Sequence, residues 1–172
     1  WETLVPDQAL LVGPNSPGDG FVRAAVAKDR SFAFVYSPRG EPVSVDQTRL
    51  QALDLSGTQV TDLSPLKGQP LVELYLEGTQ VQDLSPLRGA PLRKLYLSKT
   101  PVRDLSALKG LPLEELNAVD TQVADLTPLA GCKQLQMLWL TGSPVENIAP
   151  LAEVPLVSLT LQRTKVKDLS PL

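Results

Sequence analysis

The dominant feature of the sequence is a motif that returns every 21 residues from Leu50 to the end of the chain. Its consensus is LxxLxLxxTxVxDLSPLxGxP, and only the fourth copy has 22 residues. A unit of this length cannot bury its own apolar face, so the copies must stack on one another around a common core. The six copies begin at Leu50, Leu71, Leu92, Leu113, Leu135 and Leu156.

Apolar residues at fixed positions of each copy predict that core. Positions 4 and 6 are apolar, as in Leu53 and Leu55, and only Ala118 is undersized. Position 11 is always valine, and positions 14 and 17 carry a second apolar pair such as Leu63 and Leu66. This spacing resembles that of leucine-rich repeats, and the DLSPL segment resembles their short bacterial class. The resemblance implies a solenoid of the α/β class for residues 50–172, with a parallel sheet on one side.

Each copy divides into a strand and a turn. The LxLxx stretch alternates buried and exposed side chains, which predicts a short strand in a parallel sheet. In the first DLSPL segment, Ser64 suits an N-cap, Pro65 a first helical position and Gly68 a residue just past a helix end. We therefore expect one short 3₁₀ or α-helical turn per copy, on the convex side. The fifth copy replaces the acid and the serine by Asn147 and Ala149, so its turn should be the least well held.

The ninth position usually carries asparagine in that class, but here it carries a hydroxyl in every copy. A hydroxyl has one donor and two lone pairs, so it can take over part of the role of an amide. We expect a weaker form of the ladder that joins adjacent copies, made by Thr58, Thr79, Thr100, Thr121, Ser143 and Thr164.

The first 46 residues follow a different pattern. Apolar stretches at 21–27, 31–36 and 41–45 are separated by the turn-forming segments 28–30 and 37–40, which predicts an antiparallel meander. Three strands alone are marginal, so we expect this segment to be part of a β-sandwich or a cap over the first repeat. The predicted domains are a meander at 1–46 and six repeats at 50–172.

Two stretches of this segment, WETLVPDQALL and FVRAAVAKDRSFAFVYSPRGEPVSVD, carry a second resemblance. They are similar to the C-terminal β-sandwich of bacterial apiosidase-like glycoside hydrolases, a module also catalogued as a collagen-binding domain of a collagenase. In that family the catalytic carboxylates lie in a preceding barrel, so no catalytic residue is carried over to this chain. The resemblance implies descent from a secreted carbohydrate-active or matrix-associated protein, and it favours a secreted or cell-surface location.

Both ends of the sequence indicate a fragment. The chain begins with Trp1 rather than methionine, shows no charged and apolar leader, and stops at Leu172 directly after a DLSPL turn. Repeat arrays normally end in a polar cap. We therefore expect the chain to be a piece of a larger bacterial protein.

Composition excludes several classes of function. The net charge of -3 and the isoelectric point near 5.0 offer no broad basic surface for nucleic acid. The sequence has no histidine, which removes catalytic triads and histidine metal sites, and it lacks Walker, Rossmann and zinc motifs. No apolar run approaches the roughly 20 residues that a membrane helix needs. The single cysteine, Cys132, fits a small core residue. We expect no catalysis, no cofactor and no bound metal.

An aspartate precedes the turn in five copies, and this column suggests either structure or chemistry. A carboxylate just before a helical turn accepts backbone N–H bonds and suits the positive helix end, so we assign it to structure rather than to calcium or acid–base chemistry. The column consists of Asp62, Asp83, Asp104, Asp125 and Asp168.

Function must then lie where side chains escape the repeat, at positions 3, 5, 7 and 8 on the exposed concave face of the sheet. Three aromatic residues fall at position 5, and Tyr75 and Tyr96 should be adjacent. Exposed aromatics among charges are typical of binding surfaces, although aromatics also favour strands for their own sake. The candidate ligand-binding residues are Tyr75, Tyr96, Trp139, Glu73, Glu77, Lys94, Lys99 and Asn117, with Glu115, Asp120, Met137 and Arg163 beside them.

Three roles fit this face. The first is a non-catalytic module that binds a protein or peptide. The second is a carbohydrate- or matrix-binding accessory region of a glycoside hydrolase-like protein, whose aromatics stack on sugar rings. The third is a structural spacer between the domains of a multidomain protein.

Overall fold

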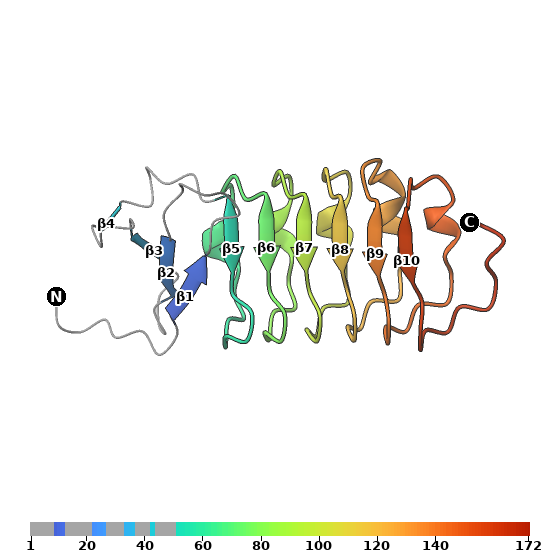
Figure 1. Ribbon diagram of the computed structural model, residues 1–172, viewed down its shortest axis with the longest axis horizontal. Helices are drawn as coiled ribbons and strands as arrows, with labels where there is room; N and C mark the ends of the chain where they lie inside the picture. Colours follow the sequence, from blue (N-terminus) through green and yellow to red (C-terminus); the bar gives the residue numbers. More distant parts are fainter. Residues whose placement is uncertain (1–8, 13–21, 27–32, 37–41, 44–50) are drawn as a thin grey trace.

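The computed structural model describes residues 9–12, 22–26, 33–36, 42–43 and 51–172. Its main body is a six-stranded parallel sheet in which each strand pairs with the strand of the next copy (Figure 1). The register places equal repeat positions opposite one another, as in Leu53 with Leu74 and Leu74 with Leu95. The predicted LxLxx strands are therefore confirmed as β5 (Ala52–Asp54), β6 (Glu73–Tyr75), β7 (Lys94–Tyr96), β8 (Glu115–Asn117), β9 (Met137–Trp139) and β10 (Ser158–Thr160).

Four further strands form a separate antiparallel sheet in the order β1-β2-β3-β4. Strands β2, β3 and β4 lie within the three predicted stretches at 21–27, 31–36 and 41–45, whereas β1 was not predicted. The turns predicted at 28–30 and 37–40 lie outside the described residues, as does the predicted boundary at 46–50. Strand β1 approaches β5, the first strand of the solenoid, but the cap role stays a prediction. The four strands are β1 (Ala9–Val12), β2 (Val22–Val26), β3 (Ala33–Tyr36) and β4 (Pro42–Val43).

One 3₁₀ turn follows the strand in each of the first five copies, on the side of the array that lies behind the sheet in Figure 1. The fourth turn has five residues where the others have three, so it absorbs the extra residue of the fourth copy. The turns are η1 (Ser64–Leu66), η2 (Ser85–Leu87), η3 (Ser106–Leu108), η4 (Thr127–Gly131) and η5 (Ala149–Leu151).

The aspartates, rather than the serines, hold the start of these turns. Ser64 is the first helical residue, and the N-cap position, Leu63, makes no side-chain cap bond, so the predicted serine cap is wrong. Instead, Asp62 Oδ1 accepts the Ser64 N–H at 2.8 Å and Oδ2 accepts the Ser64 hydroxyl at 2.7 Å. These bonds favour the ionised form and lower the pKa of Asp62. The structural role predicted for the aspartate column is confirmed.

The fifth turn keeps more of this arrangement than the sequence suggests. Asn147 Oδ1 accepts the Ala149 N–H at 2.8 Å, because an amide oxygen replaces a carboxylate oxygen as acceptor. Only the second bond, from a serine hydroxyl, is missing. Compared with the first turn, the fifth turn therefore lacks only one exposed hydrogen bond, which is less than the sequence led us to expect.

The hydroxyls at position 9 do not form the expected ladder between copies. Most of them bond within their own copy, as Thr79 Oγ1 does by donating to Leu76 O at 2.7 Å. A threonine side chain is too short to span the gap to the next copy as an asparagine would. The prediction of a general ladder is therefore wrong, and one pair alone joins two copies through these hydroxyls.

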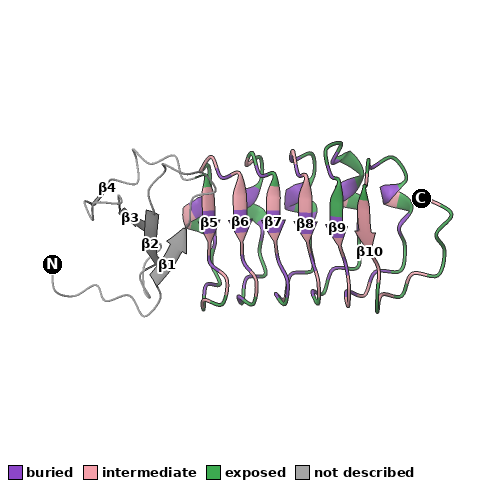
Figure 2. Cartoon of the chain, viewed as in Figure 1, coloured by how far each residue is buried: buried purple, intermediate pink, exposed green. Residues whose placement is uncertain are grey.

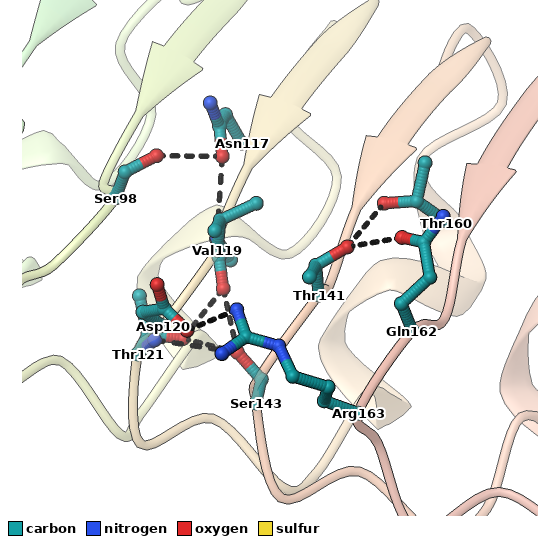
Figure 3. A network of polar contacts seen from close by, with 11 residues as sticks. Ser98, Asn117, Val119, Asp120, Thr121, Thr141, Ser143, Thr160, Gln162 and Arg163 are labelled. Atoms are coloured by element: carbon teal, nitrogen blue, oxygen red, sulfur yellow. Dashed lines mark hydrogen bonds and ion pairs between the residues drawn. The ribbon is translucent and has the colours of Figure 1, made fainter.

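That pair is Thr121 and Ser143, in the fourth and fifth copies (Figure 3). Ser143 Oγ accepts the Thr121 N–H at 3.3 Å and donates to Ala118 O at 2.6 Å. In the second copy the corresponding N–H bonds its own carbonyl directly, from Thr79 to Leu76 at 3.1 Å. The serine hydroxyl is therefore inserted into the turn of the preceding copy, and it is fully buried.

The apolar core runs through the array as one column between the strands and the turns. The middle residue of each strand from β5 to β9 is buried, which appears as a purple band in Figure 2. Cys132 belongs to this core, with its thiol against Leu108 O, and burial raises its pKa. In the last copy Leu159 is only partly buried, so burial weakens toward β10.

Candidate binding face

The side chains that alternate with the buried leucines line one face of the six-stranded sheet. Parallel pairing in equal register aligns each repeat position into a row that crosses all the strands. The row at position 5 lies near the middle of the face. It contains Asp54, Tyr75, Tyr96, Asn117, Trp139 and Thr160.

The aromatic residues of this row contact one another. The ring centroids of Tyr75 and Tyr96 lie 4.9 Å apart with an interplanar angle of 27°, so the rings stack, and the predicted adjacency of the two residues is confirmed. Tyr96 also reaches Trp139, at 6.2 Å and 32°, although β8 lies between their strands. Asn117 occupies that intervening position. All three aromatic residues are half-buried.

A row of alternating charge runs beside the aromatic row, at position 3. Lys94 Nζ lies 3.5 Å from Glu73 Oε1 and 3.7 Å from Glu115 Oε1, so two carboxylates share one ammonium group. Each carboxylate also accepts a tyrosine hydroxyl: Tyr75 donates to Glu73 Oε2, and Tyr96 donates to Glu115 Oε2. The two rows therefore form a single network that fixes the rings on the sheet.

This environment keeps both tyrosines protonated. Burial, followed by the hydrogen bond to Glu73, raises the pKa of Tyr75 to about 12. Burial and the bond to Glu115 likewise raise the pKa of Tyr96. Folding favours the neutral phenol, so these groups contribute stability below the ordinary tyrosine pKa. That contribution is lost as the pH rises through the raised, folded-state values.

An alkaline titration of tyrosinate absorbance tests this environment. Tyr75→Phe and Tyr96→Phe should leave the absorbance change below about pH 11 unaltered, because an ordinary tyrosine has mostly ionised by then. Each variant should instead remove amplitude at higher pH. In denaturant, both side chains should titrate near about pH 10. Loss of amplitude below pH 11 in the folded variants would show that the rings are not held as described.

A third row, at position 8, has left-handed backbone in every copy. Glycine occupies it in three copies, and charged residues occupy it in the other three, where strain of about 1–2 kcal/mol per residue accompanies this conformation. The glycines Gly57, Gly78 and Gly142 have φ between 70° and 77°, and the charged residues Lys99, Asp120 and Arg163 have φ of 58°, 53° and 57°.

Two of these charged residues form a bridge across the intervening copy (Figure 3). Arg163 Nη2 lies 3.1 Å from Asp120 Oδ1, and the pair passes over Gly142. A Cβ atom at Gly142 would stand 2.0 Å from Asp120 Oδ1, so only glycine leaves room for the bridge. The position-8 row therefore carries an exposed ion pair between the fourth and sixth copies.

The structure brings together most of the residues predicted as a site. Glu73, Tyr75, Lys94 and Tyr96 belong to one network, and Asn117 lies between the rings of Tyr96 and Trp139. Glu77 and Lys99 lie on the same face but form no ion pair within residues 51–172.

Sequence reasoning undervalued Glu115, which it treated as a neighbour of the site. Glu115 binds both Lys94 and Tyr96. The recurrence of Glu, Lys and Glu at position 3 of three consecutive copies was the signal that could have identified it. The Asp120–Arg163 bridge has no such signal, because its partners are separated by 43 residues.

In the described part of the chain, no group of three or more histidine, cysteine, aspartate or glutamate residues is placed to hold a metal ion. None of the helices described is long and apolar enough to cross a membrane.

Comparison with known sequences finds a similarity at the N-terminal end. Residues 5–70 match the sequence model of a family described as "putative collagen-binding domain of a collagenase". The match agrees with the resemblance of residues 1–46 and continues past them into the first repeat. None of the curated proteins matches the sequence.

Comparison with solved structures identifies the repeat region. An internalin (inlF) of Listeria monocytogenes is 27% identical, with a TM-score of 0.67, and the match covers 77% of this chain and 47% of the internalin. Internalin C2 of the same species is 32% identical, with a TM-score of 0.62 and coverages of 77% and 61%. A leucine-rich-repeat protein of Leptospira interrogans shares the fold at 22% identity, with a TM-score of 0.52 and coverages of 62% and 29%. The chain therefore spans about half to three fifths of the length of the two internalins.

Proposed function

We propose that this chain, a leucine-rich-repeat protein, is a non-catalytic recognition module that binds a protein or peptide across its sheet face. Its repeat region has the fold of bacterial internalin-type solenoids. The aromatic row supplies the anchors, and the polar rows beside it set specificity. The residues assigned to binding are Tyr75, Tyr96, Trp139, Glu73, Glu77, Lys94, Lys99 and Asn117.

The contiguous aromatic row is the observation that carries this proposal. Aromatic side chains provide large contact areas with a polar end, and they dominate the energetics of protein interfaces. Tyr75 and Tyr96 are already held by stacking and by hydrogen bonds to Glu73 and Glu115. A partner would therefore meet side chains that lose little rotamer freedom on binding, which favours affinity.

Selection from a displayed peptide library tests the proposal. Peptides selected on the intact protein should lose at least about tenfold in affinity for the Tyr75→Ala/Tyr96→Ala/Trp139→Ala variant, because truncation of interface anchors typically costs more than about 1 kcal/mol each. Fluorescence polarisation measures the affinity, and circular dichroism verifies that the variant is folded. The matched control is Lys67→Ala/Arg88→Ala/Lys109→Ala, which removes three exposed side chains beside the 3₁₀ turns and should leave binding unchanged.

Two results would contradict the proposal. One is a set of selected peptides that bind the folded triple aromatic variant as tightly as the parent. The other is the absence of any peptide that depends on the face, which would favour the spacer role instead.

Binding to carbohydrate or extracellular matrix is the second candidate function, and the family match at residues 5–70 supports it. Glycan arrays and immobilised collagen are the probes. A glycan bound by the parent and lost in Tyr96→Ala and Trp139→Ala would favour the sugar role for the sheet face. Collagen binding that survives in the triple aromatic variant would instead assign matrix binding to surfaces outside that row.

A further inference from the structure

The sheet face carries more acidic groups than basic ones. Over positions 3, 5, 7 and 8 of the six copies there are five carboxylates against three cations, a net charge of −2. Arg163 is engaged by Asp120, and Lys94 stands between two glutamates. The carboxylates are Asp54, Glu73, Glu77, Glu115 and Asp120, and the cations are Lys94, Lys99 and Arg163.

Lys94 does not saturate its two partners. Its Nζ lies 3.5 Å from Glu73 and 3.7 Å from Glu115, longer than the roughly 2.7–2.9 Å of a direct charge-assisted hydrogen bond. Each carboxylate therefore has acceptor capacity left at the surface. A second cation placed against this row would be attracted by both.

The tyrosine hydroxyls cannot supply donors to a partner. Tyr75 gives its proton to Glu73, and Tyr96 gives its proton to Glu115. What the two hydroxyls still offer is oxygen lone pairs. This end of the aromatic row therefore presents acceptors and negative charge, and a complementary partner must bring donors and positive charge.

Asn117 provides the opposite chemistry at the centre of the face. Its Oδ1 accepts the Val119 N–H at 3.1 Å and the Ser98 hydroxyl at 2.8 Å (Figure 3). A backbone N–H can only donate, so the atom facing Val119 must be the oxygen, which fixes the orientation of the amide. The Asn117 Nδ2 group then points away from Ser98 and Val119, as Figure 3 shows, and it can donate to a carbonyl oxygen.

The ring geometry argues against a stacked sugar as the occupant. A sugar stacks on an open aromatic face, whereas Tyr75 and Tyr96 turn faces toward each other at 4.9 Å. Tyr96 has Trp139 as its other aromatic neighbour, at 6.2 Å. Each tyrosine therefore turns one ring face toward the other tyrosine rather than toward a ligand, while a polypeptide can contact ring edges and bond the polar groups beside them.

We propose that the occupant of this face is an extended polypeptide segment that places a lysine or arginine side chain against Glu73 and Glu115 and a main-chain carbonyl on Asn117 Nδ2. This inference rests on the proposed peptide-binding function and specifies the partner's chemistry. Complementary charge mainly sets specificity and association rate, whereas the aromatic row supplies contact area.

The test starts from peptides that bind the parent and fail to bind the triple aromatic variant. Replacing their arginine by citrulline, or their lysine by acetyl-lysine, removes the charge and should weaken binding by about tenfold or more. Glu73→Gln and Glu115→Gln should each weaken the charged peptide but not its neutral counterpart. Glu153→Gln is the matched control, because Glu153 is exposed and paired with Lys133 away from the face.

The Asn117→Asp variant tests separately whether Asn117 Nδ2 donates a hydrogen bond to the peptide. Aspartate keeps an oxygen for Val119 and Ser98 but replaces the NH₂ donor by a second oxygen. Affinity for the basic peptide should fall by several-fold even though the variant adds negative charge. A rise in affinity would overturn the assignment of Asn117.

The outcomes separate this inference from the function on which it rests. Peptides that depend on the aromatic row but carry no basic residue, or that tolerate citrulline and acetyl-lysine, overturn the basic-segment inference and leave the peptide-binding function standing. An absence of peptides that depend on the aromatic row overturns both.

Discussion

Replacing Leu95 by alanine is expected to lower the free energy of unfolding by about 2 to 5 kcal/mol. Leu95 is fully buried in the middle of the array, between Leu74 and Leu116 of the adjacent strands. Truncation removes its apolar contacts and leaves a cavity that the flanking copies cannot fill, because both are pinned by the parallel sheet. Chemical denaturation followed by circular dichroism measures the loss.

Two control variants make this result specific to the position. Leu159→Ala makes the same change at the same repeat position, but Leu159 is only partly buried, so a smaller loss is expected. Lys67→Ala changes an exposed side chain and should alter stability by less than about 0.5 kcal/mol. Equal losses for Leu95→Ala and Lys67→Ala would contradict the assignment of buried and exposed positions.

Replacing Ser143 by alanine is expected to cost about 1 to 3 kcal/mol, more than its small volume suggests. The hydroxyl is fully buried and joins two copies, by accepting from Thr121 N–H and donating to Ala118 O. Its removal leaves the Thr121 N–H without its partner inside the protein. Thermal and chemical denaturation both measure the effect.

Thr79→Val is the matched control for this prediction. Thr79 is equally buried, but Leu76 O, which accepts its hydroxyl, also accepts the Thr79 N–H. Loss of the hydroxyl therefore leaves that carbonyl bonded, and the cost should stay near the about 0.5–1.5 kcal/mol of an ordinary hydrogen bond. If Ser143→Ala costs no more than Thr79→Val, the turn of the fourth copy closes on itself and the serine is not needed as a link.

The solenoid could be predicted well from the sequence because the same leucine spacing recurs in every copy. A single leucine such as Leu95 says little, but leucines that recur at the same position in successive copies define the strand, its register and the buried face together. The same periodicity identified the row containing Tyr75 and Tyr96, since equal positions must align in a parallel sheet.

Details that depend on single atoms were harder to predict. Serine was the expected cap, but Asp62 binds both the N–H and the hydroxyl of Ser64, an arrangement that composition alone does not distinguish from a serine cap. Ser143 differs because it faces Ala118, where other copies have a larger residue. Such contacts depend on which residues two neighbouring copies place opposite each other, and a consensus sequence does not show this.

The charge network of the candidate site was predicted less well than the solenoid but better than these single contacts. The residues at position 3 were recognisable as surface-facing, yet their pairing depends on how side chains lean across strands. Lys94 could have paired with one glutamate alone, and the structure instead places it between Glu73 and Glu115. The two glutamates are also held by hydrogen bonds from the Tyr75 and Tyr96 hydroxyls, an arrangement that no periodicity encodes.

The left-handed backbone at position 8 gives the array a row of surface positions at which glycine and charged residues can replace one another. Each copy holds the same backbone shape there whether the residue is glycine, as at Gly78, or charged, as at Lys99. A charge can therefore be added to or removed from the face in one copy while the leucine column behind it stays unchanged, at a local cost of about 1–2 kcal/mol. Gly142 is the exception, because the bridge between Asp120 and Arg163 already fills its space. The charge of the sheet face can thus change copy by copy, independently of the fold that carries it.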